Sequence, residues 1–361
     1  MRPFFSIIMA CCDVEPYIRE AVESVTKQSF GDWECICGIE ESKDRTEEIL
    51  REMASADPRI KLFNHPRSGS CSATRNVGTD MARGEYVIFL DGDDTIADGS
   101  LARIHDKIAA RPGADLYPCR IVAYTEGTDE REIRENYPPE SSPEEMTGPE
   151  ATVLLNRLWD GKFCPMLQMT VFRREYLVER DLKCIYGLRR QDSEFSPRAL
   201  YYSKRVVPLH EPFYLYRIRE NSISTAGMSQ AGFFHRDWAI ILRSLMAFHA
   251  RVSKEPGFDR GISKSWARQW ERRIVSFWFS PDNLRAVSRE KRVETLSLLF
   301  ENGAGDYKLL ARYVPCSTRL AMHWIFVFSK HPACRGTIEF LFKLYFAMFP
   351  SCRKGMEGIR V

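Results

Sequence analysis

The chain has 361 residues, a formal net charge of +3, and hydrophobic residues at 44% of its positions. This length allows one large domain with an appendage, or two domains with cores of their own. A charge so close to neutral gives no support for nucleic acid as a partner. The 11 cysteines are scattered without CxxC spacing, so we expect reduced core residues in a cytosolic protein.

The sequence predicts neither an export signal nor a membrane-spanning helix. Its N-terminus runs directly into a strand pattern without a long apolar segment. No stretch reaches the roughly 18 uncharged apolar residues that a span requires. We therefore expect a cytoplasmic protein.

The first hundred residues alternate apolar runs of strand length with segments of helical spacing. This alternation predicts a mostly parallel sheet, which binds its ligands at the carboxyl ends of its strands. A GxGxxG motif after the first strand and a GxxxxGK[ST] motif are both missing, which excludes dinucleotide-binding dehydrogenases and P-loop enzymes. The expected strands are 4–10, 33–39, 59–63 and 84–91, and the expected helices are 16–27, 46–53 and 70–82.

The strand that begins at Gly84 ends in three carboxylates, Asp91, Asp93 and Asp94. Acids this close together repel one another and need a cation, hydrogen-bond donors or water. Oxygen-only ligands suit Mn²⁺ or Mg²⁺, whereas the alternative is a polar turn without a ligand. Glu40 ends a second strand at the same edge, which favours a binding site over a chance turn.

After the first hundred residues, the expected strands and helices alternate less regularly up to about residue 220. Asp192 opens a helix, where an acid serves either as a cap or as a functional group. The stretch 126–145 is dense in charge and proline and predicts an exposed loop. Further expected elements are helices at 101–110, 149–159 and 173–180, an apolar segment at 166–172, and strands at 115–124, 205–208 and 212–218.

Four blocks between residues 4 and 225, in this order, resemble the family 2 glycosyltransferases. The resemblance implies an α/β GT-A fold, Rossmann-like, with a mostly parallel sheet flanked by helices. The blocks are EPYI (15–18) with QSF (28–30), TRNVG (74–78) before GEY (84–86), FLDGDD (89–94), and QDSEF (191–195) with YRIRENSIS (216–224).

The resemblance also implies chemical roles. Asp91 and Asp93 would contact the ribose-diphosphate part of a nucleotide sugar, and Asp93 and Asp94 would hold Mn²⁺ or Mg²⁺. Asp192 would be the catalytic base that accepts a proton from the acceptor hydroxyl. Such direct displacement inverts the configuration of the transferred sugar.

Four further positions complete the predicted donor site. Glu40 falls where the family usually has an aspartate that recognises the nucleobase. Arg75 could orient an acidic strand tip, while Arg217 and Arg219 could bind either the diphosphate or acidic neighbours. The chain departs from the family pattern at ACCD (10–13), IEES (39–42) and Gln191, and the first two departures lie in the nucleobase pocket.

Strand signals disappear after Gly227, and the chain becomes a series of amphipathic helical segments. We expect helices at 233–251 and 265–279, then short apolar segments at 320–328 and 338–349 with basic flanks. These segments either pack as a helical appendage or lie in a membrane interface. The predicted domains are a catalytic domain at 1–226, with a nucleotide-sugar half (1–100) and an acceptor half (101–226), and a helical C-terminal region at 227–361.

The resulting hypothesis is a metal-dependent, inverting glycosyltransferase. It would move a sugar from a nucleotide donor, UDP being the family's commonest, to a hydroxyl of a surface glycan or of its lipid-linked precursor. One alternative is a catalytically silent binding module with the same fold. Another is a sugar nucleotidyltransferase, but that class needs a glycine-rich basic loop where this chain has Cys11-Cys12-Asp13.

Overall fold

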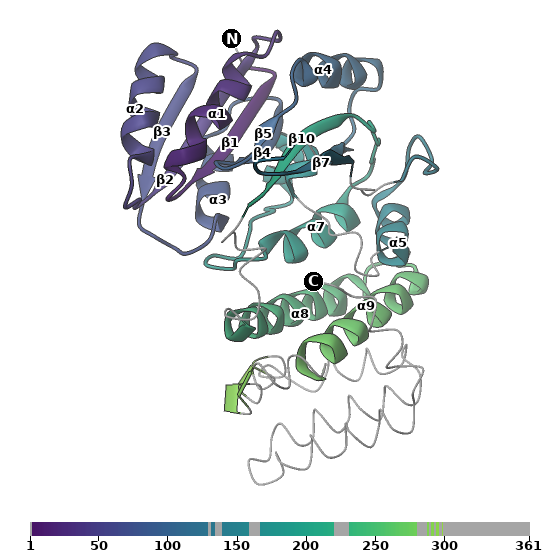
Figure 1. The fold of residues 1–361 in the computed structure, drawn as a ribbon. Helices are drawn as coiled ribbons and strands as arrows, with labels where there is room; N and C mark the ends of the chain where they lie inside the picture. Colours follow the sequence, from purple (N-terminus) through teal and green to yellow (C-terminus); the bar gives the residue numbers. More distant parts are fainter. Residues whose placement is uncertain are drawn as a thin grey trace. The chain divides into compact units, whose positions relative to one another are not determined.

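The computed structural model describes residues 2–128, 131–133, 139–158, 167–219 and 231–279, with a few single positions between 287 and 298. It divides into two compact units (Figure 1). Unit 1 comprises residues 1–152 and 164–222, and unit 2 comprises residues 153–163 and 223–361. The division predicted at residue 226 and the two halves of the catalytic domain stay predictions. The predicted apolar segments 320–328 and 338–349 lie outside the described residues.

The larger sheet of unit 1 confirms the predicted α/β class. Its strand order is β3-β2-β1-β4-β9-β6, and β1 to β4 are parallel neighbours, whereas β9 is antiparallel to both β4 and β6. The carboxyl ends of β1, β2 and β4 therefore meet at one edge. The strands are β1 (Phe5–Cys11), β2 (Trp33–Glu40), β3 (Ile60–His65), β4 (Tyr86–Asp91), β6 (Leu116–Pro118) and β9 (Thr170–Arg173).

Two glycines allow helix α3 (Ser72–Met81) to lie close to this sheet. A Cβ at Gly78 of α3 would come within 2.4 Å of Ile8 on β1. A Cβ at Gly38 of β2 would lie 2.5 Å from the side chains of both Phe63 and Thr74. Since no larger residue fits at either position, the close packing fixes where α3 presents its polar side chains. The other helices of the first half are α1 (Glu15–Thr26), α2 (Thr46–Ala56) and α4 (Ser100–Ala110).

A second, smaller sheet has the order β5-β10-β7-β8. β5 follows directly after the acidic residues and pairs with β10, so that β10 lies beside them. The predicted strand 115–124 is two strands, because its first half pairs with β9 and its second half with β10. These strands are β5 (Thr95–Ile96), β7 (Arg120–Thr125), β8 (Arg131–Ile133) and β10 (Pro212–Ile218).

Two predictions for the second half of unit 1 were partly wrong. The described part of the stretch 126–145 is mostly exposed, as predicted, but it is not a loop throughout, because β8 lies within it and pairs with β7. The predicted strand 205–208 forms only isolated bridges at Val206, and Pro208 has no N–H to extend a ladder. The remaining elements are α5 (Gly148–Leu158), the 3₁₀ helix η1 (Leu167–Met169), α6 (Arg174–Glu179) and α7 (Gln191–Tyr202).

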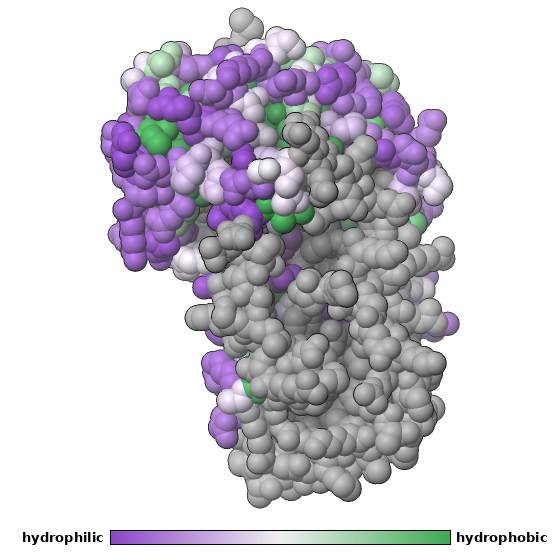
Figure 2. Space-filling model, viewed as in Figure 1, coloured by the Kyte–Doolittle hydropathy of each residue, from purple (hydrophilic) through white to green (hydrophobic). Residues whose placement is uncertain are grey.

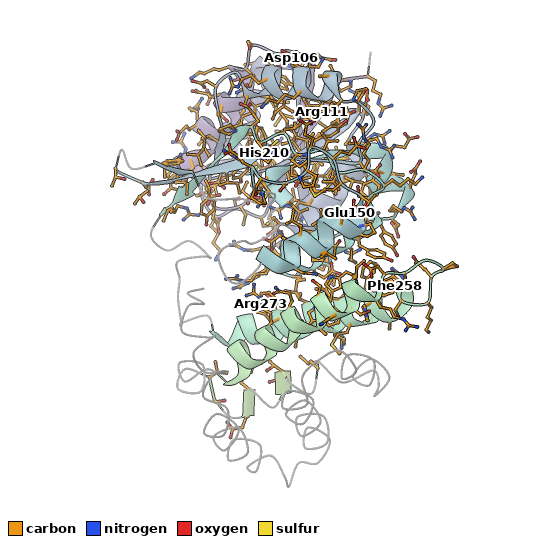
Figure 3. All side chains as sticks on the ribbon, turned by 90° about the vertical axis from the view of Figure 1, so that its right-hand side faces the viewer. Asp106, Arg111, Glu150, His210, Phe258 and Arg273 are labelled. Carbon is orange, nitrogen blue, oxygen red and sulfur yellow. The ribbon has the colours of Figure 1, made fainter. Side chains whose placement is uncertain are left out.

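The described part of unit 2 is helical, as predicted. Helices α8 (Ala231–Val252) and α9 (Arg260–Phe279) pack together, and their interface is rich in aromatic rings. Figure 3 labels Phe258, just before α9, and Arg273 nearer the other end of that helix.

Among the described residues, no helix combines the length and the apolar character needed to cross a bilayer. The face of unit 1 drawn in Figure 2 is mostly hydrophilic, and its hydrophobic residues are scattered. Isolated exposed apolar residues of this kind are normal for a protein surface.

Candidate active site

The carboxyl end of β4 forms a tight acidic turn. The backbone N–H of Asp94 donates to the carbonyl of Asp91 (3.1 Å), and that of Gly92 donates to the carbonyl of Ala10 on β1 (3.0 Å). The turn therefore packs against the end of the neighbouring strand. It presents Asp91, Asp93 and Asp94 at the edge where the sequence predicted a site.

Asp91 is held from two sides. Nη2 of Arg75, on α3, donates to Oδ1 of Asp91 (2.7 Å), and Nε2 of Gln168, on η1, donates to Oδ2 (2.6 Å). Arg75 is only 2% exposed, and a buried guanidinium needs a counter-charge of this kind. Both partners fix the direction of the carboxylate at the strand tip.

Arg75 also joins this strand tip to the start of α7. With its amide oriented to satisfy its neighbours, Gln191 accepts a hydrogen bond from Nη1 of Arg75 and donates to the carbonyls of Leu188 (2.7 Å) and Arg189 (2.6 Å). Gln191 is the first residue of α7, and Asp192 is the second. One buried arginine thus connects the acidic turn with the helix that carries the predicted base.

The carboxyl of Asp192 lies in a partly buried position in the first turn of α7. Its Oδ1 accepts a hydrogen bond from the backbone N–H of Ser193 (2.8 Å). Burial raises the pKa of Asp192 above its ordinary value, the charges of Arg190 and Arg75 lower that pKa, and the nearby Asp91 raises it. A carboxylate whose proton affinity is increased in this way is a better proton acceptor than an exposed one.

Asp93 is paired with Arg219. Nε and Nη2 of Arg219 both donate to Oδ2 of Asp93, at 3.1 and 2.8 Å. Burial and the charge of Asp91 raise the pKa of Asp93, while Arg219 lowers it. Both bonds from Arg219 reach Oδ2, so Oδ1 is the oxygen of this carboxyl group that faces away from the arginine pair.

The side chain of Arg217 binds the backbone of the same turn. Its Nε donates to the carbonyl of Asp93 (2.9 Å), its Nη2 donates to Glu20 (2.5 Å), and its guanidinium packs on the rings of Tyr17 and Tyr124. Both Arg217 and Arg219 therefore contact acidic neighbours in the structure. Their contact with a diphosphate stays a prediction.

Asp94 has both carboxylate oxygens occupied by β10. The hydroxyl of Tyr214 donates to Oδ2 (2.6 Å), and the backbone N–H of Arg217 donates to Oδ1 (2.7 Å). Burial raises the pKa of Asp94 well above its ordinary value. Asp94 thus ties the turn to the second sheet, and its predicted role as a metal ligand stays a prediction.

The oxygen atoms at this edge fit a hard divalent cation that is bound partly by the protein and partly by a substrate. In the part of the chain that the structure describes, no three His, Cys, Asp or Glu side chains form a ready metal cage. Asp93 offers one carboxylate oxygen, and the neighbouring side chains of the acidic turn also carry oxygen atoms that can bind a metal. Mg²⁺ and Mn²⁺ commonly bind through one or two carboxylates together with substrate phosphates.

A second group of polar residues lies at the ends of β1 and β2. Glu40 is buried, and Ser68 donates a hydrogen bond to its Oε1. Asp13, at φ +50°, accepts from the backbone N–H of Lys43 (2.7 Å) and from Arg67 (2.6 Å). These contacts link the loops after three parallel strands and define the rim of the predicted nucleobase pocket.

Cys12 lies on this rim and is partly buried. Burial is the main cause that raises the pKa of its thiol to about 11, and Arg67 opposes that shift. The side chain is therefore a neutral thiol at neutral pH. It can pack against a base but carries no charge for recognising one.

Sequence reasoning missed three residues of the site: Gln168, Tyr214 and Arg67. Each contacts an acid that is 54 to 120 residues away in the chain. None of them lies in a motif, and nothing in the local sequence separates them from ordinary polar residues. The sequence did single out Arg75, which contacts the acidic strand tip in the structure.

Comparison with known proteins identifies the class. Residues 6–180 match the model described as glycosyl transferase family 2, so the chain carries a family 2 glycosyltransferase domain. Its fold is similar to that of S. aureus TarS residues 1–349 in complex with UDP-GlcNAc, with a TM-score of 0.68 and 19% identity over 94% of this chain and 91% of that one. The predicted GT-A fold is thereby confirmed.

Among its sequence relatives is the protein named "Uncharacterized glycosyltransferase EpsJ" of Bacillus subtilis (strain 168). The two are 31% identical over 226 residues, which cover 62% of this chain and 64% of the relative. The Campylobacter jejuni protein named "GalNAc(5)-diNAcBac-PP-undecaprenol beta-1,3-glucosyltransferase" is 24% identical over 72% of this chain and 79% of its own length. The chain thus spans less than two thirds of the first of these relatives.

Proposed function

We propose that this protein transfers a sugar from a UDP-sugar to a hydroxyl of a surface glycan or of its lipid-linked precursor, with inversion and with the help of Mn²⁺ or Mg²⁺. One observation carries the proposal. Arg75 binds Asp91 at the donor-side strand tip and also the first residue of α7, next to Asp192. One buried cation therefore joins the strand tip proposed to bind the donor to the start of the helix that carries the proposed base.

The acidic turn and the two arginines serve the leaving group. As the glycosidic bond breaks, negative charge grows on the diphosphate, and a divalent cation bound by Asp93 and Asp94 would offset it. Arg217 and Arg219 lie beside the same turn. An arginine side chain can bind phosphate oxygens through two parallel hydrogen bonds. Asp91 and Glu40 are proposed to bind the ribose and the base.

Asp192 serves the acceptor. Its carboxylate accepts the proton of the acceptor hydroxyl while that oxygen bonds to the anomeric carbon and the bond from that carbon to the diphosphate breaks. Attack from the face opposite the leaving group inverts the configuration. The raised pKa of Asp192 suits this role, because a base works best when its pKa approaches the working pH.

The choice of substrates rests on similarity. The UDP-GlcNAc complex of TarS supports a UDP-sugar as donor, and the name of the Campylobacter jejuni relative supports a polyprenyl-diphosphate-linked glycan as acceptor. We accordingly propose action at the cytoplasmic side of the membrane that holds such acceptors. The helices that follow residue 227 are the proposed contact with that membrane.

A binding experiment tests the donor half of this proposal. Calorimetry with UDP, GDP, dTDP and their sugars, in Mn²⁺ and then in chelator, should give tight binding only for uridine nucleotides with metal. Asp93→Asn should weaken the metal-dependent binding at least about tenfold, because it removes a negative ligand. Asp106→Asn is the matched control, since Asp106 is 80% exposed on α4 (Figure 3) and lies outside the site.

Two outcomes would contradict the proposal. Equal binding with metal and with chelator would remove the metal from the mechanism. No binding of any nucleotide would favour the silent binding module over the enzyme.

A further inference from the structure

One buried amide of the active site has an unused hydrogen-bonding atom. Gln168 lies on η1, which packs against β4, α7 and β10, the three elements that carry Asp91, Asp192 and Arg217. Its side chain comes from none of the sequence motifs. It is also almost fully buried, at 6% exposure.

The orientation of this amide is set by its neighbour. Nε2 donates to Oδ2 of Asp91 at 2.6 Å, and the opposite orientation would place Oε1 against a carboxylate. Oε1 therefore points away from Asp91. Within the described residues this buried oxygen has no hydrogen-bond partner. Buried polar atoms rarely lack one, and an exception beside a candidate active site is a position where a bound molecule can supply the partner.

The position of the amide indicates which part of a substrate could reach it. Asp91 is close to Asp93 on one side, and through Arg75 it connects to the helix of Asp192 on the other. In a direct displacement, the transferred sugar lies between the leaving phosphate and the attacking hydroxyl. Since η1 packs against both β4 and α7, Gln168 lies between the two elements that would face the transferred sugar.

We propose that Oε1 of Gln168 accepts a hydrogen bond from a hydroxyl of the transferred sugar and that Gln168 thereby helps to select the donor. This inference rests on the proposed function, because it presupposes a sugar nucleotide in the site. The amide oxygen can only accept a hydrogen bond. It therefore distinguishes a sugar that has a hydroxyl within reach, equatorial or axial, from a deoxy analogue that lacks this hydroxyl. Such an analogue leaves a buried acceptor without a partner, which sites of this kind reject strongly.

The test compares ligands with and without the sugar. Gln168→Met keeps the length of the side chain and removes its acceptor. In Mn²⁺, calorimetry should show that the Kd of UDP-glucose or UDP-GlcNAc rises about tenfold more than the Kd of UDP. A role limited to holding Asp91 would raise all of these constants equally, and that result would overturn the inference.

Deoxy donors sharpen the same test. Wild-type protein should bind one monodeoxy UDP-sugar about tenfold more weakly than the parent, and Gln168→Met should bind the two equally. The inference would be contradicted if the variant bound every monodeoxy UDP-sugar more weakly than the parent by the same factor as wild-type protein does. That result is expected if Oε1 binds only water. Gln168→Leu repeats the measurement if the methionine variant does not fold.

The chain offers a matched control. Thr152 on α5 also has a buried hydroxyl without a partner among the described residues, but it is outside the site, so Thr152→Val should change none of the constants. Failure of wild-type protein to bind UDP or its sugars would overturn the proposed function and this inference together. Intact binding with equal losses for UDP and UDP-sugar would overturn the inference alone.

Discussion

The acidic turn of unit 1 and the core around His249 of unit 2 bury ionisable side chains in different ways. In unit 1, Asp91 and Asp93 each have an arginine as a direct partner, Arg75 and Arg219. In unit 2, His249 is fully buried, and its Nε2 shares a hydrogen bond with the hydroxyl of Ser263 (2.7 Å). Its ring also contacts the aromatic rings of Phe258, Trp266 and Trp270.

This difference separates the candidate active site from a packed core. Charge persists in a protein interior only where an opposite charge or hydrogen bonds offset the loss of water, as they do at the acidic turn. Burial without such an offset lowers the pKa of His249 to about 4, so the ring is neutral at neutral pH. His249 is therefore a neutral side chain of the core, whereas Asp91 and Asp93 of unit 1 each have an arginine as counter-charge.

The largest expected effect comes from removing the proposed base of unit 1. Asp192→Asn should lower the rate of sugar transfer about 10³-fold, because an amide cannot accept the proton of the acceptor hydroxyl. The Kd of UDP measured by calorimetry should stay nearly unchanged, since the shape of the side chain is kept. A variant that loses nucleotide binding to the same extent would assign Asp192 to the donor site instead.

The next effect concerns the stability of unit 2. The pKa of His249 is about 4 when folded and 6.5 as its ordinary value, so the unfolded chain binds the proton more tightly. Stability should consequently fall as the pH drops from about 6.5 toward 4, by about 3 kcal/mol in total. Denaturant unfolding followed by tryptophan fluorescence at several pH values measures this loss.

His249→Gln supplies the comparison for that experiment. Glutamine can keep a hydrogen bond to Ser263 but has no proton to gain, so this part of the pH dependence should vanish. Equal pH slopes in the two proteins would mean that other groups cause the acid sensitivity.

The smallest effect tests the cation shared by Asp91 and Asp192. Arg75→Met should lower transfer at neutral pH about tenfold, because Asp91 loses the partner that directs it. It should also move the acidic limb of the pH–rate profile to higher pH, since the positive charge that lowers the pKa of Asp192 is gone. Arg75→Lys keeps the charge, so its acidic limb should remain close to that of the wild-type protein; a limb displaced equally in both variants would contradict the electrostatic role.

Much of the architecture of unit 1 follows from the sequence. Apolar runs of strand length alternate with amphipathic segments, and this pattern alone predicted β1 to β4 with their helices to within a few residues. The same pattern placed Asp91 and Glu40 at carboxyl strand ends, where parallel sheets bind ligands. Order and spacing of four motifs then predicted the family, and they also predicted Asp192 as the catalytic base.

Only the tertiary structure decided which side chains meet. Gln168 reaches Asp91 across 77 residues, and Tyr214 reaches Asp94 across 120, because β9 and β10 pair beside elements far from them in the chain. A sequence pattern reports which face a residue occupies but not its partner on another element. The direction of each pKa shift depends on that partner and on burial, and both arise only when the sheets and helices pack together.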